Sequence, residues 1–164
     1  WHWKYSNRAE EFKKDFLDFF KIEMPRVYGG HKFIGGAACY YLKAIPFIKE
    51  NLPEANIAII KRNRNEVIEA FANKLNLDDK HTEAIITSKF LSKLDPNASN
   101  WEIAYPKYQS IEGVERMDLF KELVGSYWDE FYGAAYRYAE QYKNVKIYNS
   151  EELIKENNYK KLVE

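Results

Sequence analysis

The feature that most constrains this chain is a short apolar strand that ends in a basic turn and leads into a helix. The apolar run Ile57–Lys61 is followed at once by Arg62–Val67, with sequence RNRNEV, and then by helical spacing of apolar residues. A helix N-terminus at the carboxyl end of a strand offers backbone N–H groups and a positive dipole end, and arginine side chains beside it suit phosphate or sulfate oxygens. The turn therefore predicts a local anion site, although solvated arginines at a strand end would give the same pattern.

Composition sets broad limits on partners and compartment. The 164 residues suffice for one domain with a sizeable core. Lys plus Arg and Asp plus Glu number 25 each, so we expect neither nucleic acid nor an anionic membrane as a partner. No apolar run is long enough to span a membrane. The single cysteine, Cys39, excludes an internal disulfide and fits a cytoplasmic protein, although a reduced extracellular domain fits nearly as well.

The rest of the chain alternates helical patterns with short strand patterns. Helices are expected at 7–21, 37–51 with a division at Pro46, 67–75, 82–94 and 117–142, and a last short one from Ser150. Strands are expected at Pro25–Tyr28, Ile57–Lys61 and Val145–Tyr148, with a long ordered loop at 98–115. Because strands that alternate with helices pair in parallel, we predict a helix-rich α/β fold of three layers, with a short, mostly parallel sheet flanked by helices.

Three segments carry motifs in a fixed order. They are residues 25–31 (PRVYGGH), 62–67 (RNRNEV) and 124–153, which contains VGSYW, VKIY and SEEL. Together they resemble the sulfotransferase family's strand ending in Lys-Thr-His, its Arg-Asn-Pro-x-Asp-Val turn, and its Gly-Ser-Trp helix followed by a strand and a Tyr-Glu-Asp-Leu segment. The resemblance implies a P-loop-like fold, related to that of P-loop NTPases. It also implies a transferase that moves a sulfonate group from the nucleotide 3′-phosphoadenosine-5′-phosphosulfate to an acceptor hydroxyl or amine.

The resemblance assigns the catalytic role to His31. Gly29 stands where the family has its catalytic lysine, so Lys32 is the nearby lysine that could act instead. The chemistry of histidine suits the role independently, because a hydroxyl that attacks sulfur must lose its proton and a neutral imidazole accepts protons near pH 7. A structural histidine at a strand end is the alternative.

Five further residues are expected at the donor site. Arg62 falls on the arginine that holds the donor's 3′-phosphate, where a guanidinium fork matches phosphate oxygens better than an ammonium group does. Asn63 and Arg64 belong to the same helix start, and Arg64 is either an exposed helix-start residue or a second, weaker phosphate contact. Ala70 and Ser150 occupy the positions of a phosphate-binding serine and an adenine-stacking tyrosine, so both lack the family's functional group.

We expect residues 1–164 to form one sulfotransferase-like domain, a fragment incomplete at both ends, because the family's phosphosulfate loop has no counterpart in the sequence. Three functions remain open. The first is a sulfotransferase with a small-molecule or glycan acceptor, and the second is a degenerate fold that binds without catalysis. The third is another P-loop-like nucleotide-binding protein or an interaction domain.

Two expectations concern other ligands and self-association. The three histidines, His2, His31 and His81, share no metal-ligand spacing, so we expect no metal. A sheet that lacks the family's first strand would leave an exposed edge, and exposed edges favour pairing with a second copy, which would give a homo-oligomer.

Overall fold

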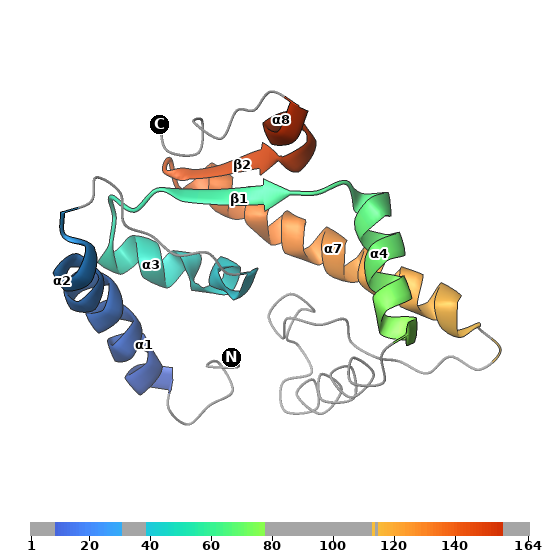
Figure 1. Cartoon of the computed structure of the whole chain (residues 1–164), viewed down its shortest axis with the longest axis horizontal. Coiled ribbons are helices and arrows are strands. Elements are labelled where there is room, and N and C mark those ends of the chain that lie inside the picture. Colours follow the sequence, from blue (N-terminus) through green and yellow to red (C-terminus); the bar gives the residue numbers. More distant parts are fainter. Residues whose placement is uncertain (1–8, 31–38, 78–112, 114, 156–164) are drawn as a thin grey trace.

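The computed structural model describes residues 9–30, 39–77, 113 and 115–155, and within them the chain is a helix-rich mixed α/β structure (Figure 1). The elements are α1 (Ala9–Asp18), the π-helical segment η2 (Phe19–Glu23), α2 (Met24–Tyr28), the 3-10 segment η3 (Cys39–Ala44), α3 (Ile45–Asn51), β1 (Ile57–Lys61), α4 (Arg64–Leu77), α7 (Arg116–Gln141), β2 (Val145–Asn149) and α8 (Ser150–Lys155). The helix predicted at 82–94 and nearly all of the loop predicted at 98–115 lie outside the described residues.

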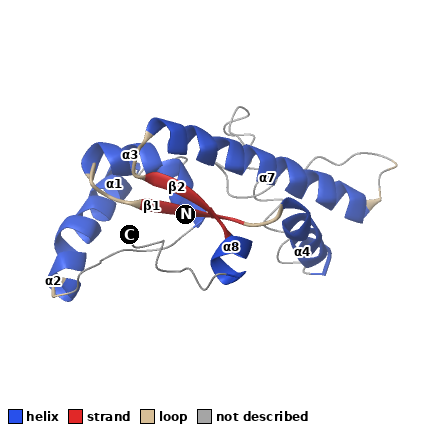
Figure 2. Ribbon diagram, turned by 90° about the horizontal axis from the view of Figure 1, so that it is seen from above, coloured by secondary structure: helices blue, strands red, loops and turns tan. Residues whose placement is uncertain are grey.

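The two strands pair in parallel, as predicted. The register aligns Ile57 with Val145 and Lys61 with Asn149, so both strands end at the same edge of the sheet. α4 and α8 therefore begin at the same end of the strand pair (Figure 2). In the described residues the sheet has these two strands, and helices α3 and α7 cover one of its faces. On the opposite face Ala58 and Ile60 are exposed, so the described part shows the sheet and one helical layer of the predicted three.

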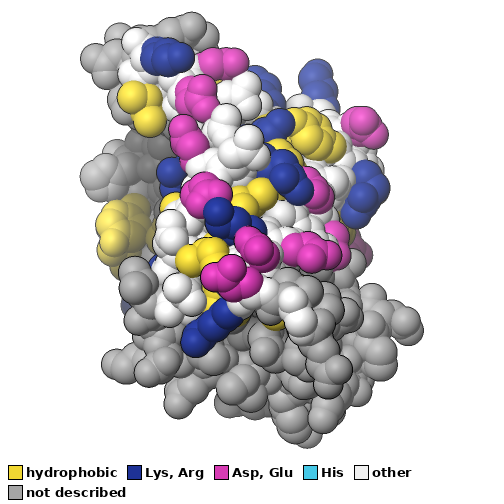
Figure 3. All heavy atoms as spheres, turned by 90° about the vertical axis from the view of Figure 1, so that its right-hand side faces the viewer, with side chains coloured by type: hydrophobic (Ala, Val, Ile, Leu, Met, Phe, Trp, Pro, Cys, Tyr) yellow, Lys and Arg dark blue, Asp and Glu magenta, His cyan; other side chains and the backbone are white. Residues whose placement is uncertain are grey.

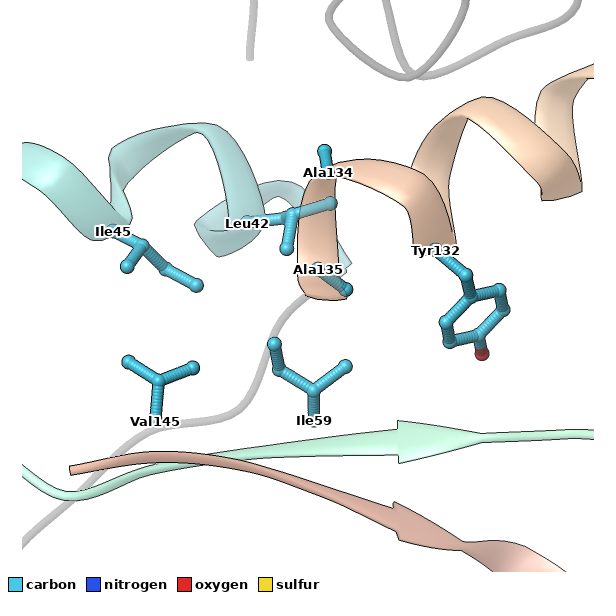
Figure 4. Close-up of a cluster of buried hydrophobic side chains, with 7 residues drawn as sticks. All are labelled: Leu42, Ile45, Ile59, Tyr132, Ala134, Ala135 and Val145. Carbon is cyan, nitrogen blue, oxygen red and sulfur yellow. The ribbon is translucent and has the colours of Figure 1, made fainter. Parts of the chain in front are cut away.

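The main core lies between this covered face of the sheet and the helices (Figure 4). Its buried members come from η3, α3, α7 and both strands: Leu42, Ile45, Ile59, Tyr132, Ala134, Ala135 and Val145. The alternation of side chains along a strand explains why Ile57 and Ile59 face the helices while Ala58 and Ile60 do not. Each large apolar side chain buried here stabilises the fold by about 1.5–3 kcal/mol before the entropy of ordering the chain is counted.

A second core joins α4 to α7. Ile68, Ala72 and Leu75 of α4 pack against Phe120 and Val124 of α7, and all five are buried. The spacing of the α4 residues by four and three positions places them on one helix face. This contact fixes the direction of α4 relative to α7, and it therefore fixes where the helix begins after β1.

The hydroxyl of Tyr132 holds the carboxyl end of β1. It donates a hydrogen bond to the Ile60 carbonyl oxygen (2.9 Å) and accepts one from the Arg62 N–H (3.4 Å). The Ile57 N–H points toward β2, where it donates to the Asn144 carbonyl oxygen. The backbone polar groups of successive strand residues point to alternate edges of the strand. Those of Ile60 and Arg62, three and five residues further on, therefore point toward the other edge of β1. The Tyr132 hydroxyl thus replaces the peptide group that a further strand would offer there.

The strand predicted at Pro25–Tyr28 is wrong, because these residues form helix α2. Helical spacing continues through α1 and η2 and buries Phe16 and Met24, and this burial outweighs the local strand preference of Val27 and Tyr28. Pro25 lies in the first turn of α2, where its missing N–H is tolerated. The helix ends at Gly29, where a Cβ atom would clash with the carbonyl oxygen of Pro25.

The division predicted near Pro46 is present. The 3-10 segment η3 ends at Ala44 and α3 begins at Ile45, with Pro46 in its first turn. In the described residues no helix is both long enough and apolar enough to cross a membrane.

Replacement of Tyr132 by Phe should destabilise the fold by about 1–3 kcal/mol, because two backbone groups at the end of β1 lose their partner. Urea unfolding of the variant and the parent measures this difference. Tyr136→Phe is the matched control, since its exposed hydroxyl accepts a hydrogen bond from the Lys61 side chain and from no described backbone group. Equal effects of the two changes would contradict an anchoring role for Tyr132.

Candidate anion-binding site

Parallel pairing brings two of the predicted donor-binding positions to one edge of the sheet. Lys61 and Asn149 are register partners at the ends of β1 and β2. The next residues along the two strands are Arg62, which enters the turn before α4, and Ser150, which begins α8. Ligands of open α/β sheets bind at the carboxyl ends of the strands, so this edge is the candidate site.

Asn63 caps helix α4. Its side-chain oxygen accepts hydrogen bonds from the N–H groups of Asn65 (3.0 Å) and Glu66 (3.3 Å), and its carbonyl oxygen accepts the first intrahelical bond from Val67 (3.1 Å). An asparagine at this position commonly satisfies helix-start donors in this way. Two of the N–H groups that the sequence suggested for an anion are therefore already bonded within the chain.

Arg62 is exposed, and its guanidinium makes no hydrogen bond or ion pair with any described residue. Its backbone N–H is held by the Tyr132 hydroxyl, so the side chain starts from a fixed point at the end of the strand. Burial raises the pKa of Tyr132, while the N–H of Arg62 and the charge of Lys61 act in the opposite direction. Among the residues predicted for the donor, Arg62 is the one whose positive charge is open to a ligand.

Arg64 is engaged with Asp129 of α7 in a two-pronged ion pair. Its Nε and Nη2 atoms donate to the two carboxylate oxygens at 2.8 and 2.7 Å. The hydrogen bond with Asp129 raises the pKa of Arg64, and the same bond lowers the pKa of Asp129. Gly125 makes room for the contact, because a Cβ atom there would lie 3.0 Å from Nη2 of Arg64.

The other predicted site residues are Ala70, Ser150, His31 and Lys32. Ala70 is exposed on α4, and at 1.5 Å of rise per residue it lies about 9 Å along the helix from Arg64. Ser150 is half-buried at the start of α8. His31 and Lys32 lie outside the described residues.

Sequence reasoning missed an aromatic group beside the end of β1. The Lys61 ammonium donates to the Tyr136 hydroxyl (2.7 Å) and lies 5.4 and 5.2 Å from the ring centres of Trp128 and Tyr136. Trp128, Tyr132 and Tyr136 are spaced four residues apart on α7, which places them on one helix face. The indole N–H of Trp128 is buried and has no partner among the described residues.

Comparisons with known proteins return nothing for this chain: no family model, no curated protein and no solved structure matches it. In the described ranges no three His, Cys, Asp or Glu side chains come together as metal ligands. The site is therefore interpreted from its own residues.

Removal of the Asn63 cap by Asn63→Ala should destabilise the protein by about 1 kcal/mol, because two N–H groups at the start of α4 lose their acceptor. Asn63→Ser keeps a side-chain acceptor and is expected to stay within a few tenths of a kcal/mol of the parent. Chemical unfolding of the three proteins provides the comparison. A Ser variant as unstable as the Ala variant would show that capping is not what Asn63 contributes.

Proposed function

We propose that this chain is a sulfotransferase-type protein that holds 3′-phosphoadenosine-5′-phosphosulfate at the carboxyl edge of β1 and β2. The acceptor is a hydroxyl or amine of a small molecule or glycan. The observation that carries the proposal is the register of the strand pair, which aligns Lys61 with Asn149, so that the residues after them, Arg62 and Ser150, follow the strands at the same edge. The resemblance of the sequence assigns these two positions to the same donor nucleotide.

The state of Arg62 supports phosphate binding at this edge. The residue is exposed, and its side chain starts from a backbone position fixed by Tyr132. Fixing the anchor before binding lowers the entropy lost when a ligand is ordered. A guanidinium can also form two parallel hydrogen bonds with one phosphate group.

The proposed reaction moves the sulfonate in one displacement. The acceptor oxygen or nitrogen attacks the sulfur, the bond from sulfur to the 5′-phosphate oxygen breaks, and 3′,5′-diphosphoadenosine leaves. The acceptor's proton passes to His31 as general base, and Lys32 stabilises the charge on the leaving phosphate.

A second candidate function is binding of the same nucleotide without catalysis. It is favoured by a specific observation, since Pro25–Tyr28 forms a helix and the strand expected to present His31 is absent. Ala70 and Ser150 also lack the groups that the family uses to hold the donor. Both candidates share the phosphate contact at Arg62 and differ in the role of His31.

Arg62→Lys should weaken the binding of 3′,5′-diphosphoadenosine by several-fold or more, because a lysine cannot form the two-pronged contact with phosphate. Arg64→Lys should change the affinity little, since the parent side chain is already engaged with Asp129. Isothermal titration calorimetry of the parent and both variants gives the three affinities. A larger loss at Arg64 than at Arg62 would place the phosphate elsewhere in the turn, and no binding by the parent would refute the proposal.

The role of His31 separates the enzyme from the binding module. With an acceptor that the parent sulfonates, His31→Ala should lower turnover by about a hundredfold or more while leaving nucleotide affinity nearly unchanged, as expected for loss of a general base. Steady-state kinetics with labelled donor measures both quantities. Turnover within a few-fold of the parent would exclude His31 as the base, and a parent that binds the nucleotide but transfers nothing would favour the binding module.

A further inference from the structure

We infer that Arg64 is a second phosphate-binding residue of this site and that Asp129 sets the affinity of the site by holding Arg64 when no anion is bound. The inference rests on the proposed function, because the ligand is the phosphate group of the same nucleotide. It goes beyond the resemblance, since the family's turn has proline where this chain has Arg64.

The position of Arg64 on α4 brings the turn within reach of its side chain. Arg64 is the first residue of the helix, and helical side chains lean toward the helix N-terminus. From this first position the side chain can reach past the N-terminus of the helix to the turn formed by Arg62 and Asn63. In the structure it lies across α7 instead, with both prongs on Asp129.

Asp129 lies next to the same turn. It is on α7 three residues before Tyr132, and residues three apart are neighbours on one helix face. The Tyr132 hydroxyl contacts the Arg62 N–H, so the Asp129 carboxylate is on the α7 face that meets the end of β1. There its negative charge opposes an incoming anion and also occupies the guanidinium that an anion would use.

The ion pair between Arg64 and Asp129 can be replaced by a contact between Arg64 and a phosphate group. Its side chains are 43% and 54% exposed, and ion pairs in water at a protein surface contribute little to stability. A phosphate group carries more negative charge than a carboxylate and accepts the same two-pronged contact. In the parent protein the binding free energy gained when Arg64 contacts the phosphate is offset by the free energy lost when its contact with Asp129 breaks. This offset explains the small change in nucleotide affinity expected for Arg64→Lys.

The chain also contains a matched control. Lys121 of α7 and Glu69 of α4 form an ion pair of 2.8 Å between the same two helices, with side chains 37% and 57% exposed. Glu69 lies five residues further along α4 than Arg64, away from the turn. Glu69→Gln removes one negative charge and one α4–α7 ion pair, as Asp129→Asn does, but leaves Arg64 held.

The test is a titration of the folded chain with 3′,5′-diphosphoadenosine. Asp129→Asn should bind it about three- to tenfold more tightly than the parent, the range expected for coupling between neighbouring charged groups. Glu69→Gln should bind as the parent does. In the double variant Asp129→Asn with Arg64→Gln most of the gain should disappear, because only the part due to the removed negative charge does not require the released arginine. Urea unfolding confirms that each variant is folded.

Gly125→Ala separates release of Arg64 from loss of charge. The added Cβ would lie 3.0 Å from Nη2 of Arg64 and 3.4 Å from Cδ1 of Ile68, so the guanidinium must shift by a few tenths of an ångström, which loosens its contact with Asp129 without changing any charge. The Gly125→Ala variant should therefore bind 3′,5′-diphosphoadenosine more tightly than the parent, as Asp129→Asn does. The Cδ1 contact is ordinary packing distance, so the α4–α7 core should remain intact.

Several results would overturn the inference. They are an unchanged affinity in Asp129→Asn, an equal gain in Glu69→Gln, and a gain that is undiminished when Arg64 is also replaced. If the parent binds the nucleotide through Arg62 and any of these results appears, this inference alone fails. If neither the parent nor Asp129→Asn binds the nucleotide, the proposed function fails and this inference fails with it.

Discussion

The parallel pairing of β1 with β2 is the constraint on which the rest of the described structure depends. It makes both strands end at one edge, and α4 and α8 therefore start there. The long helix α7 covers one face of this pair and supplies the Tyr132 hydroxyl that holds the last peptide groups of β1. Without that hydroxyl, the end of β1 would have a free edge just where the candidate site begins. A single buried side chain thus connects the core to the turn that carries Arg62.

Apart from Arg62, the positive groups at the start of α4 already have partners before any ligand arrives. The Asn63 side chain accepts from two N–H groups at the start of α4, and Asp129 holds Arg64. The side toward which the strands point shows the same balance, because basic and acidic side chains are interspersed on its described surface (Figure 3). A site of this kind gains little from long-range attraction, which needs a charge of one sign over a wide area. Its selectivity must come from contacts at short range.

Local pattern was enough to predict most of the described elements and was insufficient for the contacts between them. The strands β1 and β2, their parallel pairing, and helices α4 and α7 were predicted because apolar spacing and turn residues are short-range signals. The error at Pro25–Tyr28 arose because four residues carry too little pattern to outweigh burial of the helix that precedes them. The pairing of Arg64 with Asp129 joins residues 65 positions apart, and no local signal predicts it. The cap by Asn63 is different, because it reaches N–H groups only two and three residues away, and an asparagine just before a helix is a local signal for capping.

The distance along the chain between the two strands has a consequence during synthesis. Ile57 and Val145 are register partners that lie 88 positions apart in the sequence. At about 5–20 residues per second, β1 leaves the ribosome roughly 4–18 s before its partner strand does. For that time an apolar segment waits unpaired, which is the condition that promotes aggregation. Lys61 ends this segment and Arg62 follows it, and flanking charges of this kind oppose association of exposed strands. The basic turn can therefore protect the nascent chain before it can bind any ligand.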